Sequence, residues 1–360
     1  MSNRRNFLKN FGAAAGGAYL MGNGLNALAQ PTRREVTLNG KRVTTVDVHA
    51  HCVIPEVEEM VKGTSLSGAP FPPWQVLGPS RFEEMDRRGI DYQALSMAIY
   101  GHWWYAADRE FAARIVRAAD ESLAAWVEQH PDRFVALSSV ALPYPDLAAA
   151  QLEYAVKELG ARGASIGGQV HGEYPSAERF DVFWAKAEEL DVPVFMHPAL
   201  GAPNLVMENT LKGRGGLDNV IGGPLETTLF LTHMIFDGTL DRFPNLKVVG
   251  AHGGGYLPSY LGRTEVACER FQDEEANCLN TKKPSEYLQS QIFADSMVFS
   301  AEGLRHLVAE MGASQVVYGT DSPFPWPETM DLIIDSPTLS DAEKEAILGG
   351  NLLRMLRIEG

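Results

Sequence analysis

The chain has 360 residues, of which 45% are hydrophobic and 21% charged, so it can bury one large core and has no bulk bias toward disorder. Its formal net charge of −15 argues against nucleic acid or an anionic membrane surface as a partner. The three cysteines, Cys52, Cys268 and Cys278, form no CxxC motif, and we expect neither a disulfide framework nor a cysteine zinc site.

The N-terminus has the pattern of a twin-arginine export signal. Arg4 and Arg5 precede a weakly apolar run rich in Ala and Gly, and the Ala-Leu-Ala sequence at 27–29 has the form of a signal-peptidase site. The run is too short and too rich in glycine to span a membrane. We expect residues 1–29 to be the signal and residues 30–360 to be one domain. The protein would then be exported folded to the periplasm, or be cytoplasmic if the signal is not used.

The first part of the expected domain leads to a histidine-rich strand end. A short β-like piece at 35–38 precedes the first long strand, which ends at His49. Residues 52–80 are rich in proline and glycine, and we expect a long loop with at most one short helix at 55–61, forming a lid over the site. Residues 81–88 follow as a helix that ends at a glycine.

From residue 92 onward, apolar strand-like segments alternate with segments of helical periodicity. The expected strands are 92–99, 133–141, 163–168, 192–196, 246–251, 291–294 and 315–319. The expected helices are 108–129, 146–159, 178–190, 226–237, 256–271, 301–311 and 341–357. With the strand at His49, this alternation predicts an α/β fold, a closed (β/α)8 TIM barrel. A doubly wound open sheet is the alternative, but no GxGxxG motif follows the first strand.

The first strand ends in two histidines that share one face. Because side chains alternate along a strand, His49 and His51 point the same way and Ala50 points the other way. Two imidazoles converging at a strand end can bind one metal ion. Two buried core histidines would give the same pattern, so the pair is weak evidence when taken alone.

Three more residues of metal-binding types stand just after predicted strands. His197 follows the fifth strand, His252 the sixth and Asp321 the eighth. In a barrel of this kind the carboxyl ends of the strands carry the chemistry, so all these side chains would face one mouth together with the first pair. Imidazoles with one carboxylate suit Zn²⁺, with Mn²⁺ or Fe²⁺ as alternatives.

This arrangement of His-x-His, two further histidines and one aspartate resembles the amidohydrolase superfamily. Within it, the chain resembles the branch of decarboxylases typified by aminocarboxymuconate-semialdehyde decarboxylase and its γ-resorcylate and 5-carboxyvanillate relatives. The likeness spans roughly residues 44–356. Its most specific motifs are His-Gly-Gly-Gly at 252–255 and Gly-Thr-Asp-Ser-Pro-Phe-Pro at 319–325. Further matching pieces lie at 81–86, 131–134, 224–228 and 243–247.

The resemblance implies a role for each site residue. It implies four metal ligands: His49, His51, His197 and Asp321. His252 would act with Asp321 as acid and base, and Arg263 would support the site. The strand at 163–168 ends without a lysine, so a carbamylated lysine bridging two metals is not expected and we predict one metal.

The implied activity is metal-dependent, non-oxidative decarboxylation of a small aromatic or muconate-type carboxylic acid. A hydrolase of the same fold, opening a lactone, amide or C–C bond, is the first alternative. A non-catalytic periplasmic metal or ligand binder is the second, although such a protein would not need an open coordination position.

The chain also departs from these decarboxylases. Residues 52–80 contain no arginine to pair with a substrate carboxylate, Ala199 stands where a relative has tryptophan, and Gln169 stands where it has histidine. We therefore expect a different pocket and substrate. Arg270 lies one position from a family arginine that is offered to the neighbouring subunit, which suggests a homodimer.

Several aromatic residues and histidines after the predicted strands could contact a planar substrate. The candidates are His102, Trp103, Tyr105, His171, Phe324 and Trp326. Packing under the lid explains the aromatic ones equally well, and His171 could simply be a solvated loop residue.

Overall fold

The computed structural model describes residues 33–68, 71–98, 101–199, 210–271, 273 and 276–359. The expected export signal at 1–29 lies outside these residues, and so does the last residue of the expected strand 92–99. Within the described part of the chain, no helix combines the length and the apolar character that crossing a membrane would require.

A ring of parallel strands forms the centre of the molecule. The strands are β3 (Val46–His51), β4 (Tyr92–Ser96), β5 (Phe134–Ala136), β6 (Ala164–Ile166), β7 (Val194–Met196), β8 (Val248–Gly250), β9 (Ile292–Asp295) and β10 (Val316–Val317). They form two sheets, β3 to β5 and β6 to β10, in which neighbours in sequence are neighbours in space. Parallel bridges from Ser138 to Ala164 and from Ala50 to Ser322 join the two sheets at both edges. The expected eight-stranded α/β barrel agrees with this order.

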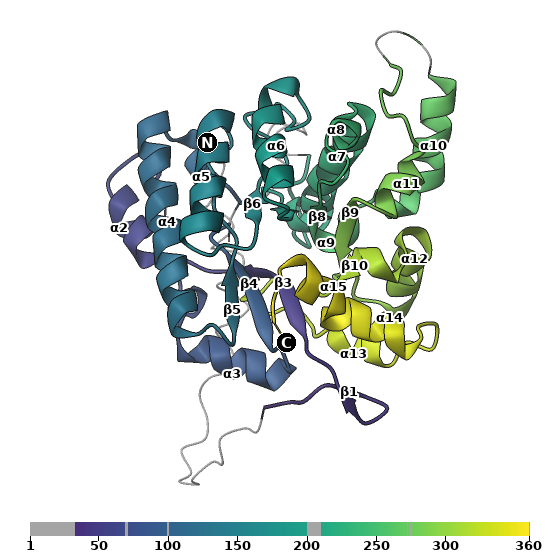
Figure 1. Ribbon diagram of the computed structural model, residues 1–360, viewed down its shortest axis with the longest axis horizontal. Helices are drawn as coiled ribbons and strands as arrows, with labels where there is room; N and C mark the ends of the chain where they lie inside the picture. Colours follow the sequence, from purple (N-terminus) through teal and green to yellow (C-terminus); the bar gives the residue numbers. More distant parts are fainter. Residues whose placement is uncertain are drawn as a thin grey trace.

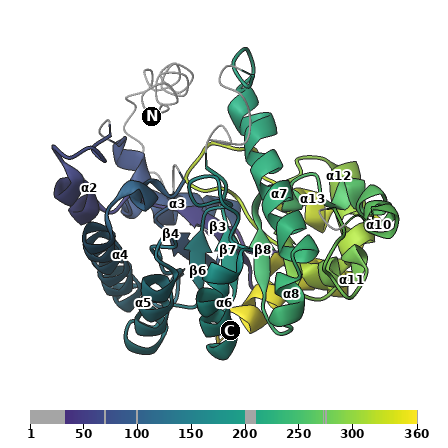
Figure 2. The same cartoon turned by 90° about the horizontal axis from the view of Figure 1, so that it is seen from above.

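Helices follow the strands along the chain and surround them, as Figures 1 and 2 show from two directions. The helices before β8 are α2 (Pro55–Val61), α3 (Pro79–Arg88), α4 (Arg109–Gln129), α5 (Pro145–Glu158), α6 (Asp181–Glu189), α7 (Gly223–Phe236) and α8 (Thr239–Arg242). Those after it are α9 (Ala251–Gly254), α10 (Leu261–Arg270), α11 (Pro284–Leu288), α12 (Ala301–Met311), α13 (Met330–Ile334), α14 (Asp341–Glu345) and α15 (Asn351–Met355). A hairpin of β1 (Thr37–Leu38) and β2 (Lys41–Arg42) precedes the barrel.

The helix α4 illustrates why these segments fold where they do. The side chain of Asp108 accepts a hydrogen bond from the backbone N–H of Phe111 and so caps the start of the helix. Ile115, Val116 and Leu123 recur at helical spacing and are buried against the strands. The cap and the apolar stripe together fix the position and the rotation of the helix.

The last expected helix, 341–357, is instead three segments. A π-helical stretch, η7 (Ala346–Gly350), separates α14 from α15. A side chain on Gly349 would meet the carbonyl oxygen of Thr44 at 2.0 Å, so the glycine lets this stretch approach the segment between β2 and β3. The expected helix 256–271 is likewise divided, into the 3₁₀ turn η5 (Pro258–Tyr260) and α10.

The expectation that no cysteines would be paired was wrong. Cys268 and Cys278 form a disulfide that closes a loop after α10, and Cys52 is free and buried. The chain turns back after α10 and brings the two Cα atoms to 5.3 Å, within the range that a disulfide spans. A separation of ten residues in the sequence does not reveal such a turn.

Candidate metal centre

The structure brings the five predicted site residues together at the carboxyl ends of the strands. Ligand atoms of His49, His197, His252 and Asp321 all lie within 4.8 Å of one another. Asp321 Oδ1 lies 3.2 Å from His49 Nε2 and 3.3 Å from His51 Nε2. It lies 4.0 Å from His197 Nε2. His49 and Asp321, which are 321 − 49 = 272 positions apart in the sequence, therefore share one small volume.

Each of the five residues has one buried polar atom that accepts or donates no hydrogen bond within the described part of the chain. These atoms are His49 Nε2, His51 Nε2, His197 Nδ1, His252 Nδ1 and Asp321 Oδ1. Buried polar atoms normally find partners, and leaving several unpaired side by side is unfavourable. Four imidazole nitrogens and one carboxylate oxygen match the donors that a divalent transition metal prefers, so the residues fit such an ion.

The histidines of β3 are oriented by groups on their far sides. Nδ1 of His49 lies 2.6 Å from Oδ2 of Asp295, and Nδ1 of His51 lies 2.8 Å from the hydroxyl of Ser96. The guanidinium of Arg81 donates to the carbonyl oxygen of His51 at 2.6 Å. In both rings Nε2 therefore remains for the centre of the cluster.

A buried carboxylate beneath the cluster ties β3 to the segment that carries Asp321. Asp47 accepts hydrogen bonds from the backbone N–H of His49 at 3.0 Å and from the side chain of Gln93 at 2.9 Å. It also accepts from the N–H and the hydroxyl of Thr320, at 3.1 and 2.6 Å. The strand end and the turn before Asp321 are thus fixed to one carboxylate.

The electrostatics of the histidines follow from burial and from the carboxylates. Burial lowers the pKa of His49, but Asp321 and Asp295 outweigh it and raise that pKa to about 10, so without a cation the ring is protonated. A bound cation would take the place of the proton on Nε2. Burial lowers the pKa of His51 to about 4. Burial and the neighbouring histidines hold the pKa of His197 and of His252 below the ordinary value, so both are neutral and able to bind a cation.

Asp321 uses its two carboxylate oxygens differently. Oδ1 faces the histidines, and Oδ2 accepts a hydrogen bond from the indole Nε1 of Trp326 at 2.7 Å. Trp326, predicted as a substrate contact, therefore touches a predicted metal ligand directly. Phe324 is buried in a small apolar cluster with Val53, next to Trp326, at the same end of the barrel.

His252 lies in a tight turn directly after β8. It has φ 56° and ψ 50°, a left-handed conformation that is unusual for a residue with a side chain. Its backbone N–H and that of Gly253 both donate to Asp295, at 3.0 and 2.8 Å. The turn places the ring of His252 5.2 Å from that of His49 and 5.4 Å from that of His197, measured between centroids.

The predicted substrate contacts that follow β4 lie close to one another. His102 is buried, its Nδ1 has no partner within the described chain, and its Nε2 lies 3.5 Å from the hydroxyl of Ser165. Burial lowers the pKa of His102 to about 3, so its imidazole is uncharged. Tyr105 accepts a hydrogen bond from Gly167, and His171 lies with Nε2 3.0 Å from the carbonyl oxygen of Tyr105.

Two other predicted residues lie differently. Trp103 is half-buried and packs against the main core. Arg263 is exposed on α10 and makes no hydrogen bond or ion pair with any residue in the described ranges. Within one chain, Arg263 is therefore not brought to the metal cluster.

The sequence pattern did not identify three buried carboxylates near the cluster, namely Asp47, described above, Asp295 and Glu226. Asp295 ends β9, directly after an expected strand, which is the same signal that identified His197. Glu226, the first residue of the expected helix 226–237, accepts from the backbone N–H of Gly168 at 3.2 Å and of Ala199 at 3.1 Å. It ties together the loops after β6 and β7, and burial raises its pKa to about 8.

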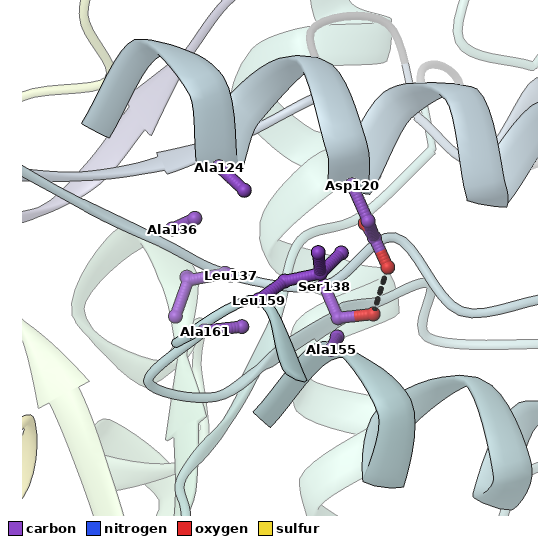
Figure 3. Close-up of a pocket in the computed structure, with 8 residues that line it drawn as sticks. All are labelled: Asp120, Ala124, Ala136, Leu137, Ser138, Ala155, Leu159 and Ala161. Carbon is purple, nitrogen blue, oxygen red and sulfur yellow. Dashed lines mark hydrogen bonds between the residues drawn. The ribbon is translucent and has the colours of Figure 1, made fainter. Parts of the chain in front are cut away.

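A separate small cavity lies between α4, α5 and β5 (Figure 3). Its volume of about 10 Å³ leaves room for roughly one water molecule. Asp120 lines it and accepts hydrogen bonds from the Ser138 hydroxyl at 2.6 Å and the Ser139 N–H at 2.9 Å. None of the residues around this cavity belongs to the metal cluster, so it is not the site of the chemistry.

The chain is similar to known proteins in sequence and in fold. A family model described as Amidohydrolase matches residues 46–358. The 2-amino-3-carboxymuconate-6-semialdehyde decarboxylase of Dictyostelium discoideum is 33% identical over 283 residues, which cover 78% of this chain and 76% of that protein. The gamma-resorcylate decarboxylase of Rhizobium radiobacter is 27% identical over 308 residues, which cover 78% and 87%.

Among solved structures, a 5-carboxyvanillate decarboxylase from Novosphingobium aromaticivorans superposes with a TM-score of 0.78 at 23% identity. The match covers 88% of this chain and 96% of that one. That structure contains manganese and 4-hydroxy-3-methoxy-5-nitrobenzoic acid. At this level of identity, the likeness shows the fold.

Proposed function

Because this chain belongs to the amidohydrolase family, we propose that it is a metal-dependent, non-oxidative carboxy-lyase acting on a small aromatic carboxylic acid. The similar curated proteins are named decarboxylases of muconate-type and resorcylate substrates, which supports this reaction class. A muconate-type acid is the alternative substrate.

His49, His51, His197 and Asp321 would hold the metal, with His252 beside it. When bound, a divalent cation would polarise a substrate oxygen and spread the negative charge that develops as CO₂ leaves. Zn²⁺ is our proposal for the native ion because of the imidazole-rich donor set. Mn²⁺ and Fe²⁺ are the alternatives, and manganese in the similar 5-carboxyvanillate decarboxylase favours the first of these. Metal analysis of the purified protein decides among them.

His252 would transfer the proton in the reaction. His252 is neutral at rest, so it first takes a proton from solvent. The ring carbon that bears the carboxylate takes this proton, and the bond to the carboxylate then breaks with its electron pair returning to the ring. CO₂ leaves, and His252 is neutral again. The position of His252 among the other imidazoles, on a turn fixed by Asp295, suits a group that must meet one substrate carbon.

One observation favours decarboxylation over hydrolysis. In hydrolysis, Asp321 would have to accept a proton from an attacking water. Its Oδ2 already accepts from the indole of Trp326, and its Oδ1 faces His49 and His51. Oδ2 is therefore occupied, and only Oδ1, which makes no hydrogen bond within the described chain, could take that proton. In decarboxylation with His252 as the proton donor, Asp321 only has to stay ionised and hold its place.

The substrate pocket would be formed by the loops after β4, β6 and β10. His102, Trp103 and Tyr105 would line one side, and Phe324 with Trp326 the other, while His171 supports the loop through Tyr105. The uncharged imidazole of His102 offers a neutral hydrogen-bonding group, and residues 52–80 contain no arginine. These features suit an aromatic ring with one carboxylate and a hydroxyl, rather than a dicarboxylic acid.

The decisive experiment measures CO₂ release from a panel of hydroxybenzoates, with lactones and amides offered in parallel. The expected result is release of CO₂ by the metal-loaded protein and none by His252→Ala with its metal content unchanged. Hydrolysis of a lactone or amide without CO₂ release would establish the hydrolase instead. Metal-loaded protein that turns over neither class, and whose ligand binding is unaffected by His252→Ala, would favour the non-catalytic binder.

We also propose that the protein is a homodimer. Arg263 and Arg270 are exposed on α10, beside the exposed apolar side chains of Tyr260 and Val266. A second copy of the chain that covered this face would bury the apolar side chains. The two arginines of each subunit would then lie against the other subunit. Light scattering after size exclusion should give twice the chain mass, and Val266→Glu should give the monomer.

The proposed location is the periplasm, after export in the folded state by the twin-arginine route. The Cys268–Cys278 disulfide supports it, because such bonds persist in oxidising compartments and are rare in the cytoplasm. Fusing residues 1–35 to a reporter tests the signal. A reporter that stays in the cytoplasm would contradict export.

A further inference from the structure

We propose that Asp295 is a positioning residue that couples the metal ligand His49 to the proton donor His252. The inference rests on the proposed function for the role of His252, but its geometry stands on the contacts of Asp295 alone. Asp295 lies at the end of β9 and its side chain is fully buried. No residue of the lid or of the predicted substrate pocket contacts its carboxylate among the described hydrogen bonds.

Within the described part of the chain, the Asp295 carboxylate accepts four hydrogen bonds, two on each oxygen. Oδ2 accepts from His49 Nδ1 at 2.6 Å and from the backbone N–H of His252 at 3.0 Å. Oδ1 accepts from the backbone N–H groups of Gly253 and Met297, at 2.8 and 3.1 Å. An ionised carboxylate offers about four acceptor positions, so Asp295 has none left for substrate or water. Its task is therefore to hold its neighbours rather than to exchange protons.

The bond to His49 determines which nitrogen of that ring faces the metal cluster. Because a carboxylate only accepts, the proton of His49 must be on Nδ1. Nε2, which lies 3.2 Å from Asp321 Oδ1, is then left as the ligand atom. The carboxylate also makes His49 a stronger electron donor toward a cation.

The bonds to His252 and Gly253 hold the turn that aims the proton donor. His252 has a left-handed backbone, and the glycines at 253, 254 and 255 all have positive φ. Residues with a side chain adopt this conformation only when their surroundings hold them there. The two N–H groups at the start of the turn both donate to Asp295, and the N–H of Gly255, which donates to the carbonyl oxygen of His252 at 3.1 Å, closes the turn.

The close approach of His49 and Asp295 depends on the glycine at position 319. A side chain on Gly319, two residues after the end of β10, would meet Cβ of Asp295 at 2.8 Å and Cβ of His49 at 3.0 Å. The absence of a side chain there lets β3 and β9 present His49 and Asp295 to each other across the short β10. One carboxylate thus links a residue of the first strand with the turn after the sixth.

The test compares Asp295→Asn with Asp120→Asn, a buried carboxylate that accepts from Ser138 and Ser139 and does not touch the metal cluster. Asparagine has an NH₂ group in place of one oxygen, and that group would face two hydrogen-bond donors and repel them. Because His49 would lose its fixed orientation, Asp295→Asn should weaken Zn²⁺ and Mn²⁺ binding about 10- to 100-fold. At saturating metal, kcat should still fall at least tenfold with KM little changed, because His252 has moved. Asp120→Asn should leave metal affinity and kcat unchanged.

Two results would overturn the proposal. Wild-type metal affinity in Asp295→Asn would remove the role toward His49, and full recovery of kcat at saturating metal would remove the coupling to His252. If Asp295→Asn does not fold, ¹⁵N NMR of the zinc-loaded wild-type protein gives a second measurement. The His49 ring should then carry its proton on Nδ1, and a proton on Nε2 would overturn the proposal.

Metal titration and the NMR measurement need no substrate. If the protein released no CO₂, these two measurements would still test the role of Asp295. Failure of the proposed decarboxylation can therefore be distinguished from failure of the Asp295 proposal.

Discussion

The indole nitrogen of Trp326 lies 2.7 Å from Oδ2 of Asp321 and holds one oxygen of the carboxylate that faces the histidine cluster. The other oxygen lies 3.2 Å from His49 Nε2. The tryptophan therefore fixes the rotation of the carboxylate, so that a single oxygen points to the metal centre. The sequence shows that Trp326 and Asp321 lie in one loop, but only the structure shows that their side chains are hydrogen-bonded.

Replacing Trp326 with phenylalanine removes this donor and keeps an aromatic ring. We expect kcat/KM for CO₂ release to fall roughly 10- to 100-fold, because a hydrogen bond to a charged group contributes about 1.5–3 kcal/mol. Steady-state kinetics at saturating metal measure the effect. Trp184→Phe is the matched control, since it removes an indole bond to Pro175 within the core. Equal losses in both variants would contradict a specific role for Trp326.

Removing the metal should abolish activity and lower the stability of the fold. Ligand binding to the folded state adds about 2.7 kcal/mol to the free energy of unfolding when free metal is about 100 times its Kd. Thermal unfolding after chelation, and again after Zn²⁺ or Mn²⁺ is restored, measures this difference. His197→Ala should have the lower melting temperature even with metal present. Metal-independent melting of the wild-type protein would argue against a cation at the cluster.

The buried carboxyl of Asp120 should make stability fall as pH rises. Burial raises its pKa to about 7, although Ser138 and Ser139 oppose the shift, whereas the ordinary value is 3.8. Between these values the folded protein keeps a proton that the unfolded chain has lost. The stabilisation is therefore complete below pH 4 and is lost progressively up to pH 7, at about 1.4 kcal/mol per pH unit at most.

Asp120→Asn should remove this part of the pH dependence, since the amide does not titrate. Urea unfolding at several values between pH 4.5 and 7.5 gives the slope for each protein. Asp146→Asn is the control, because Asp146 is exposed and its hydrogen bond to Arg109 lowers its pKa to about 2, outside that window. Identical slopes in wild type and Asp120→Asn would contradict the prediction.

The Cys268–Cys278 disulfide should stabilise the segment after α10 without supporting the metal site. Changing both cysteines to serine should lower the free energy of unfolding by about 2–3 kcal/mol, the estimate for a loop of this length. Metal content should be unchanged because neither cysteine contacts the cluster. Mass spectrometry of unreduced peptides checks the bond itself. Its absence in protein recovered from the periplasm would contradict the pairing.

The barrel could be predicted because its strands are short apolar runs that alternate with amphipathic helices. The expected ends were less accurate for physical reasons. The strand expected at 133–141 is β5, Phe134–Ala136, because beyond it the Ser139 N–H bonds to Asp120 rather than to a neighbouring strand. The helix expected at 341–357 is interrupted where Gly349 meets the backbone of Thr44.

The five residues of the cluster could be predicted from one rule, that a polar side chain just after a barrel strand faces the mouth. Asp295, which follows the expected strand at 291–294, satisfies the same rule, but a single carboxylate after a short strand is a weak signal when taken alone. The contacts of Trp326 with Asp321, and of Ser96 with His51, could not be predicted. They depend on side-chain directions across elements, which the sequence pattern does not contain.

Cys52 follows His51 directly and is fully buried at the end of β3. All three cysteines lie in the described part of the chain, and the other two are bonded to each other, so Cys52 carries the one free sulfhydryl. The molecule therefore contains its own reporter: a thiol reagent can modify Cys52 only when the strand end beside His51 opens. The rate of Cys52 modification, with and without added metal, would measure how much a bound ion reduces the opening of this strand end.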